Sequence, residues 1–89
     1  MLTITENNFP SGSQIRAARA LLEITQEQCA KGAGVSTSSV KNYEALKYDD
    51  NVLAKLNYNT IIAIWNYLDQ QNIKFVISDN EFSVSFTRE

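Results

Sequence analysis

Apolar residues recur at intervals of three and four over three stretches in the first half of the chain, which predicts three short helices. The spacing of a capping box, serine or threonine followed three residues later by glutamine, occurs at Ser11 and again at Thr25. The first helix therefore begins after Ser11 and ends near Glu23. Its apolar side is formed by Ile15, Ala18, Leu21 and Leu22.

The second helix begins after Thr25 and turns Cys29 and Ala30 inward. Either Gly32 or Gly34 can supply the positive φ that ends it. A third helix follows, capped by Ser36 and carrying the core residues Val40 and Tyr43.

Residues 47–57 are predicted to be irregular or to hold one short turn around Val52 and Leu53. Asn59 is expected to cap a longer helix, and Asn72 is expected to stop it in the left-handed conformation. The broad apolar face of this helix consists of Ile61, Ile62, Ile64, Trp65 and Leu68.

After Asn72 the apolar period changes to two, which predicts a β-hairpin over residues 73–87 with its turn at Asp79–Asn80. Residues 2–5 alternate in the same way and predict a short strand in an N-terminal arm, residues 1–10. The predicted fold class is mainly α, with four to five helices over residues 11–71 and the C-terminal hairpin. Residues 1–89 form a single domain.

The length of 89 residues suits one domain with a small core. No apolar run approaches the ~18 residues that cross a bilayer, and the first ten residues lack the basic start of a signal peptide. Cys29 is the only cysteine, so no internal disulfide can form. These features lead us to expect a cytoplasmic protein without membrane partners.

The chain contains no histidine, which together with the single cysteine argues against a zinc site and against nucleophile–histidine catalysis. The acidic residues are scattered, and no glycine-rich phosphate loop is present. We therefore expect no enzyme, no metal and no cofactor. A buried thiol is favoured over a redox sensor at Cys29, and a core position over ligand stacking for Trp65 and Tyr67.

Residues 25–44 form two predicted short helices joined by a tight glycine-containing turn, an arrangement that can place the second helix in the DNA major groove. The charge balance argues against DNA binding, because the chain contains eight basic and ten acidic residues. Residues 13–55, however, carry six basic and five acidic residues, a net charge of +1. The excess acid lies outside the motif.

The stretch of residues 14–45 resembles the lambda-repressor-like (Cro/C1-type, XRE) helix-turn-helix family. The resemblance rests on Thr25–Gln26, on Ala-Gly-Val-Ser at 33–36 and on Tyr43–Glu44, within QIRAARALLEITQEQCAKGAGVSTSSVKNYEA. The following helix and IKFVISDNEFSVSF are similar to short bacterial and phage regulators that carry a C-terminal strand pair, which suggests an origin in a phage or mobile element.

The resemblance implies three groups of functional residues. Those that would read base edges are Thr37, Ser38 and Asn42. Those that would contact the DNA backbone are Gln26, Ser36, Ser39 and Lys41. A structural ion pair would join Arg19 to Glu44. The chemistry agrees best at Asn42, because a short amide offers the donor and acceptor that match the adenine edge.

We therefore expect a transcriptional regulator that binds specific double-stranded DNA and is associated with the nucleoid, with its recognition helix at about 36–46. A homodimer joined through Phe82, Val84 and Phe86 would place two recognition helices about one DNA turn apart, ~34 Å. The third helix lacks arginine, the commonest specific contact to guanine. This departure and the acidic balance favour an alternative, a helix-turn-helix-derived protein-interaction module (antitoxin-like or an antirepressor partner) with weak or no DNA binding.

Overall fold

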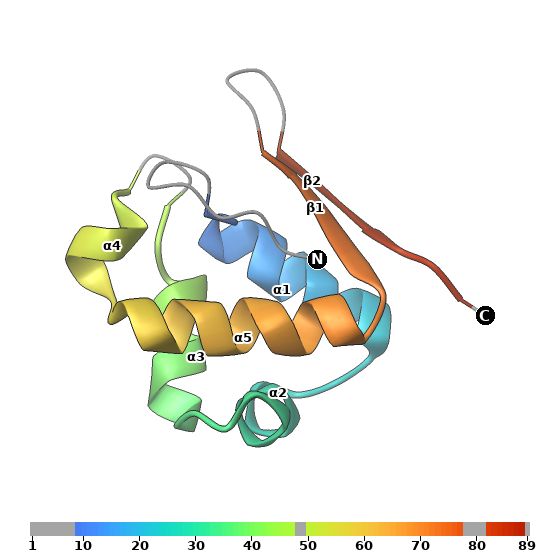
Figure 1. Ribbon diagram of the computed structural model, residues 1–89, viewed down its shortest axis with the longest axis horizontal. Helices are drawn as coiled ribbons and strands as arrows, with labels where there is room; N and C mark the ends of the chain where they lie inside the picture. The colour runs from blue at the N-terminus through green and yellow to red at the C-terminus, as the bar shows by residue number, and fades with distance from the viewer. Residues whose placement is uncertain (1–8, 48–49, 78–81, 89) are drawn as a thin grey trace.

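The computed structural model describes residues 9–47, 50–77 and 82–88. These ranges contain five helices and one two-stranded antiparallel sheet (Figure 1). The elements are α1 (Gly12–Leu22), α2 (Gln26–Ala33), α3 (Thr37–Glu44), α4 (Val52–Lys55), α5 (Tyr58–Gln70), β1 (Ile73–Ile77) and β2 (Phe82–Phe86). The mainly helical fold with a C-terminal hairpin is thus confirmed. The predicted strand at 2–5 and the turn at Asp79–Asn80 lie outside the described residues.

Both predicted capping boxes are present. The Ser11 hydroxyl accepts from the Gln14 amide N–H, and Gln14 Oε1 accepts from the Ser11 N–H at 2.8 Å. Thr25 and Gln28 make the same reciprocal pair at the start of α2. Because each box satisfies two backbone N–H groups that a helix leaves unbonded, the first residues of α1 and α2 are set by local sequence.

Residues with positive φ end or directly follow the last turn of α1, α2 and α5. Glu23 ends α1 at a φ of 58°, Gly34 ends α2 at 74°, and Asn72 follows α5 at 68°. Gly34 is therefore the residue that stops α2. Gly32 lies inside the helix, and a Cβ there would collide with the ring of Tyr67 on α5, so this glycine permits the close approach of the two helices.

Two sequence predictions are wrong in detail. The N-cap of α5 is Asn57, whose Oδ1 accepts from the Asn59 N–H at 2.8 Å, so Asn59 lies within the first turn. Two asparagines two residues apart offer the same capping chemistry, and the extended backbone at the first one decides between them. Leu21 is 44% exposed. It lies in the last turn of α1, beyond the buried residues Gly12, Gln14, Ile15 and Ala18.

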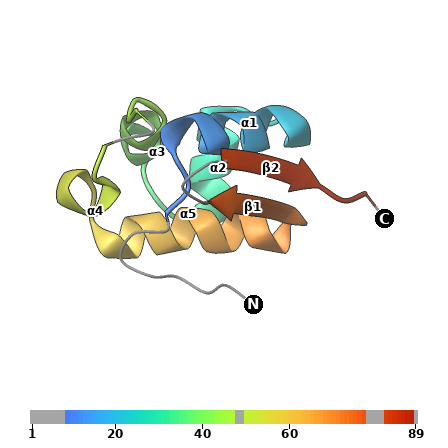
Figure 2. The same cartoon turned by 90° about the horizontal axis from the view of Figure 1, so that it is seen from above.

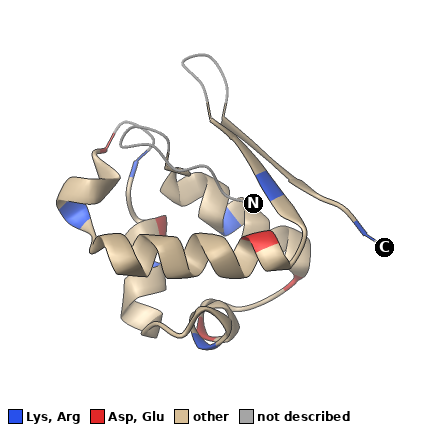
Figure 3. Cartoon of the chain, in the orientation of Figure 1, with Lys and Arg blue, Asp and Glu red and all other residues tan. Residues whose placement is uncertain are grey.

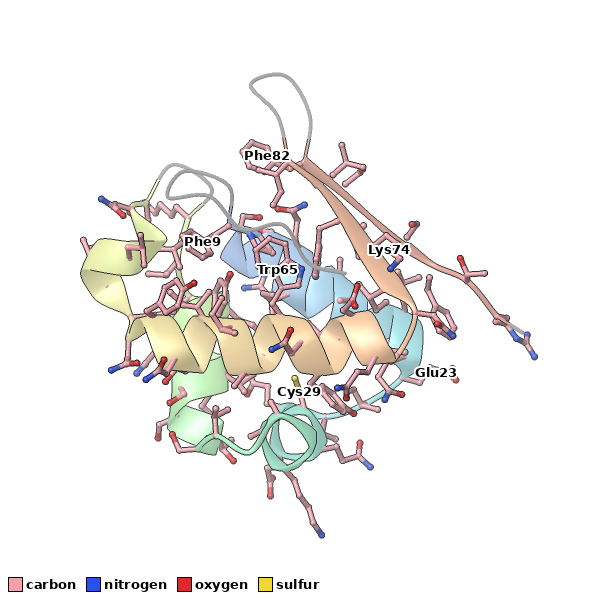
Figure 4. All side chains as sticks on the ribbon, viewed as in Figure 1. Phe9, Glu23, Cys29, Trp65, Lys74 and Phe82 are labelled. Atoms are coloured by element: carbon pink, nitrogen blue, oxygen red, sulfur yellow. The ribbon has the colours of Figure 1, made fainter. Side chains whose placement is uncertain are left out.

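The core lies among α1, α2, α3 and α5, and the hairpin covers it from the side of α1 and α5 (Figure 2). Its fully buried large side chains include Ile15, Val40, Tyr43, Ile61, Ile64, Leu68 and Ile73. The ring of Trp65 meets those of Phe9 and Phe75 edge to face, each at a centroid distance of 6.2 Å (Figure 4). Trp65 is therefore a core residue.

The hairpin register decides which strand residues meet the helices. Phe75 pairs with Val84, and Ile73 pairs with Phe86. Directly opposed residues of an antiparallel pair share a face, and this face packs against the core. Val76 belongs to the other face and is 46% exposed.

Gln14 fastens the hairpin to the helices. Its Nε2 donates to the carbonyl oxygen of Val76 on β1 at 3.1 Å and to that of Ser83 on β2 at 2.8 Å. The same side chain closes the capping box of α1 through Oε1. One buried amide therefore links the start of α1 to both strands.

The C-terminal end of α3 rests against the start of α1. A Cβ on Gly12 would collide with the backbone carbonyl oxygens of Tyr43, Glu44 and Leu46, so only glycine allows this approach. The buried Tyr43 hydroxyl also donates to the carbonyl oxygen of Pro10 at 2.8 Å. These contacts hold the C-terminal end of α3 against the start of α1.

Candidate nucleic-acid interface

Helix α3 has one buried side and one solvent-facing side. Val40, Tyr43 and Glu44 are buried. Ser38 and Asn42 are exposed and Thr37 is half-buried, so the described part of the chain leaves all three predicted base-reading residues accessible. Lys41 is exposed on the same helix. The outer side thus offers short hydroxyls, one amide and one ammonium group, a set suited to hydrogen bonding in a groove.

The serines at the start of α3 are engaged with each other. The Ser36 hydroxyl accepts from the Ser39 N–H at 3.1 Å, and the two hydroxyls lie 2.9 Å apart. Ser36 is therefore first a helix cap, and Ser39 supports it. A contact of either hydroxyl with phosphate would use the capacity left over from this pair.

Glu44 lies at the junction of α1, α2 and α3, and it is 4% exposed. Arg19 donates to it through Nε at 2.6 Å and through Nη2 at 2.9 Å, which places these residues in the ion pair that the resemblance implies. Arg19 Nη1 also donates to the Ile24 carbonyl oxygen. The hydrogen bond to Glu44 raises the pKa of Arg19 above its ordinary value, although burial opposes this rise.

The Gln26 side chain is hydrogen-bonded within the protein. Its Nε2 donates to Glu44 Oε1 at 3.2 Å. One amide hydrogen and Oε1 stay available for a ligand, so the predicted backbone contact is compatible with this geometry but is shared with the ion pair.

Arg16 joins the same junction, although no motif in the sequence marked it as a functional residue. Its Nη2 donates to the backbone oxygen of Glu44 at 2.9 Å, and its Nε lies 3.8 Å from Glu44 Oε1. The available signal was its position three residues before Arg19, which puts the two arginines on one side of a helix.

The basic residues do not gather in one patch. Figure 3 shows basic residues on α1, α2, α4 and β1 and near the C-terminus, and Lys41 adds one on α3. Lys74 on β1 is paired with Asp69 at 3.1 Å. Any anion-binding surface must therefore depend on a few well-placed groups, not on a broad basic stripe.

Cys29 is fully buried between α2 and α5 (Figure 4). Burial raises the pKa of its thiol to about 11, with a smaller contribution from the charge of Glu44. The thiol is protonated at neutral pH and packs as a small apolar side chain.

The three hairpin residues predicted at a dimer interface differ in their exposure. Val84 and Phe86 pack in part against the core of their own chain, whereas Phe82 is 42% exposed near the loop end of β2. The alternation in the sequence correctly placed these three residues on one face of the hairpin. It did not indicate that α1 and α5 cover most of that face.

Neither a family model nor a curated protein matches this chain. In the ranges that the structure describes, no helix has the length and apolarity needed to cross a membrane. The same ranges contain no group of three His, Cys, Asp or Glu side chains placed to hold a metal ion.

Proposed function

We propose that this protein is a transcriptional regulator that binds specific double-stranded DNA, with α3 and its flanking residues, about 36–46, in the major groove. The observation that carries the proposal is the division of α3 into a polar accessible side and a side braced by Glu44 and Tyr43. Because the buried side of α3 is packed against the rest of the protein, the helix can present base-reading groups without losing much conformational entropy on binding.

Within this proposal Asn42 reads an adenine edge, and Thr37 and Ser38 make less selective contacts. Gln26, Ser36, Ser39 and Lys41 contact the DNA backbone and set the register of α3 in the groove. A cytoplasmic, nucleoid-associated protein encoded by a phage or mobile element fits this role.

We further propose a homodimer joined through the outer edge of β2, at the backbone groups of Val84 and Phe86. The Thr87 N–H donates to the Asn72 carbonyl oxygen, so residues 72 and 87 form a hydrogen-bonded pair and the next pair, Ile73 with Phe86, turns its backbone groups outward. The Phe75–Val84 pair, two positions further along, also turns its backbone groups outward. Among the described residues neither Val84 nor Phe86 has a further backbone partner on that edge.

Antiparallel pairing of two β2 strands about a two-fold axis would satisfy these backbone groups. Residues 82–86, FSVSF, contain no charge and no proline, the features that usually keep an edge strand from pairing. Sedimentation equilibrium tests the dimer. A monomer at the highest soluble concentration would contradict it.

The DNA-binding test begins with a random duplex at low salt, because sequence-independent affinity appears there even in weak binders. Selection from a random oligonucleotide pool then gives the preferred site. On that site Asn42→Ala should lose ~1–3 kcal/mol of discrimination at one base pair. Asn66→Ala, at an exposed position on α5, is the matched control. Equal base preferences in the two variants would contradict the role of Asn42.

A second candidate function is a protein-interaction module that retains the helical scaffold without useful DNA affinity. The acidic balance of the chain and the exposed Val76 and Phe82 on the hairpin favour it. Complete absence of duplex retardation at low salt would support this candidate over the regulator.

A further inference from the structure

We propose that Arg16 binds a backbone phosphate of duplex DNA and adds its positive charge to the interface. The inference rests on the proposed function, and it adds a contact from α1 that the helix-turn-helix residues themselves do not include. Helix α3 carries no arginine, and Arg16 would supply a guanidinium to the interface from α1 instead.

The Arg16 side chain is anchored at one end and open at the other. Its Nη2 donates to the Glu44 backbone oxygen at 2.9 Å, whereas Nη1 has no hydrogen-bond partner among the described residues. The side chain is 59% exposed. A guanidinium that is already oriented loses less freedom when it binds a second oxygen ligand than a freely rotating lysine does.

The charge at the junction is not balanced. The Glu44 carboxylate is matched by two hydrogen bonds from Arg19, whose side chain is only 19% exposed. No other carboxylate within the described ranges lies at ion-pair distance from either arginine. One unit of positive charge is therefore left over, and it is located on the more exposed guanidinium, that of Arg16.

Arg16 lies next to the residues that the proposed function assigns to DNA. Its Nε and the Nε2 of Gln26 both approach the same oxygen, Glu44 Oε1, at 3.8 Å and 3.2 Å. Asn42 lies two residues before Glu44 on α3. A phosphate that accepts from Gln26 at the start of α2 would therefore be within reach of the Arg16 fork.

A phosphate is favoured over a base edge as the ligand. Arg16 belongs to α1, and its contact with the backbone oxygen of Glu44 holds it at the C-terminal end of α3, away from the half-buried Thr37 at the N-terminal end. Such a contact positions a helix on the duplex but carries no sequence information.

The test measures affinity for the selected duplex and for a random duplex by fluorescence anisotropy over a series of salt concentrations. Arg16→Gln should lower the slope of log K against log salt by about 0.9 per bound subunit. The advantage of the parent protein over this variant should therefore shrink by about 3- to 4-fold between roughly 50 and 200 mM salt. The loss should be equal on both duplexes, since a phosphate contact does not discriminate sequences.

Lys74→Gln is the matched control, because its side chain is 63% exposed and the charge change is the same, but it lies on β1. It should leave the slope unchanged. Arg16→Lys should restore the slope while binding less tightly, because the charge returns without the planar fork. Circular dichroism confirms that each variant is folded.

An Arg16→Gln slope equal to that of Lys74→Gln, with the parent protein still binding DNA, would overturn the assignment of Arg16 alone. If the parent protein binds no duplex at low salt, this inference fails together with the proposed function. A loss confined to the selected duplex would show that Arg16 reads a base, and it too would overturn the phosphate assignment.

Discussion

The junction at Glu44 allows a sharp prediction about stability. Replacing Glu44 by alanine removes the acceptor of two short hydrogen bonds from Arg19 and of one from Gln26. The carboxylate is almost completely buried, and the Arg19 side chain retains 19% exposure. Glu44→Ala therefore leaves a guanidinium without its partner in a largely dry environment.

The magnitude follows from this burial. Breaking a fully buried ion pair by removing one partner costs about 3–5 kcal/mol. Arg19 keeps its hydrogen bond to the Ile24 carbonyl oxygen and some contact with solvent, so we expect about 2–3 kcal/mol. For a domain of this size, 1 kcal/mol corresponds to a change in Tm of about 4–8 °C. Glu44→Ala should thus lower Tm by roughly 10–20 °C.

The assay is thermal unfolding followed by circular dichroism at neutral pH and one fixed protein concentration, since dimerisation would make Tm depend on concentration. The exposed pair of Lys74 and Asp69 is the comparison, and Lys74→Gln should cost less than about 1 kcal/mol. Adding Arg19→Met to Glu44→Ala should recover part of the loss, because the unpaired charge is then gone. A Tm unchanged by Glu44→Ala, or a double variant with fully additive losses, would refute the reasoning.

Three further predictions concern the scaffold. Gln14→Glu should destabilise the protein at neutral pH more than Gln14→Met, because the carboxylate faces two carbonyl oxygens that the amide now satisfies; equal chemical-denaturation midpoints would contradict this role. Gly12→Ala should cost about 1–3 kcal/mol, since the new methyl group meets rigid backbone at the end of α3, whereas Ser13→Ala next to it should be nearly neutral; denaturant titration of both variants checks the difference. The pKa of the buried Cys29 thiol is raised to about 11, above its value of about 8.5 in an unfolded chain, so unfolding releases a proton and the free energy of unfolding should fall by about 2 kcal/mol as pH rises from about 8 to 10. Cys29→Ala should show a smaller fall over the same window, and identical pH profiles would argue against a buried neutral thiol.

Local sequence determined the helices with good accuracy. The capping residues Ser11, Thr25 and Ser36 and the stop at Asn72 were predicted and are present. These features depend on hydrogen bonds between residues three or four positions apart, and such partners can be read from the chain directly. The period-two alternation indicated the hairpin for the same reason, because it is a property of neighbouring residues.

The candidate site was predictable only in part. The outward position of Asn42 and Ser38 follows from helical periodicity once Val40 and Tyr43 are assigned to the core. The placement of Arg16 beside Glu44 does not follow from periodicity, because the two residues are 28 positions apart and meet only where α1 crosses α3. Periodicity also did not indicate that Leu21, in the last turn of α1, is exposed.

The chain by itself determined the order of the helices and the hairpin, the capping residues of the first three helices, and the absence of histidine and of a cysteine pair. Tertiary structure decided which faces meet. It laid the apolar face of the hairpin onto α1 and α5, joined Gln14 to Ser83 across 69 positions, and brought Arg16, Arg19 and Gln26 to one carboxylate. The physical reason is that such contacts depend on the crossing angles and registers of whole elements. These are fixed by packing the complete core and are not encoded in any one segment.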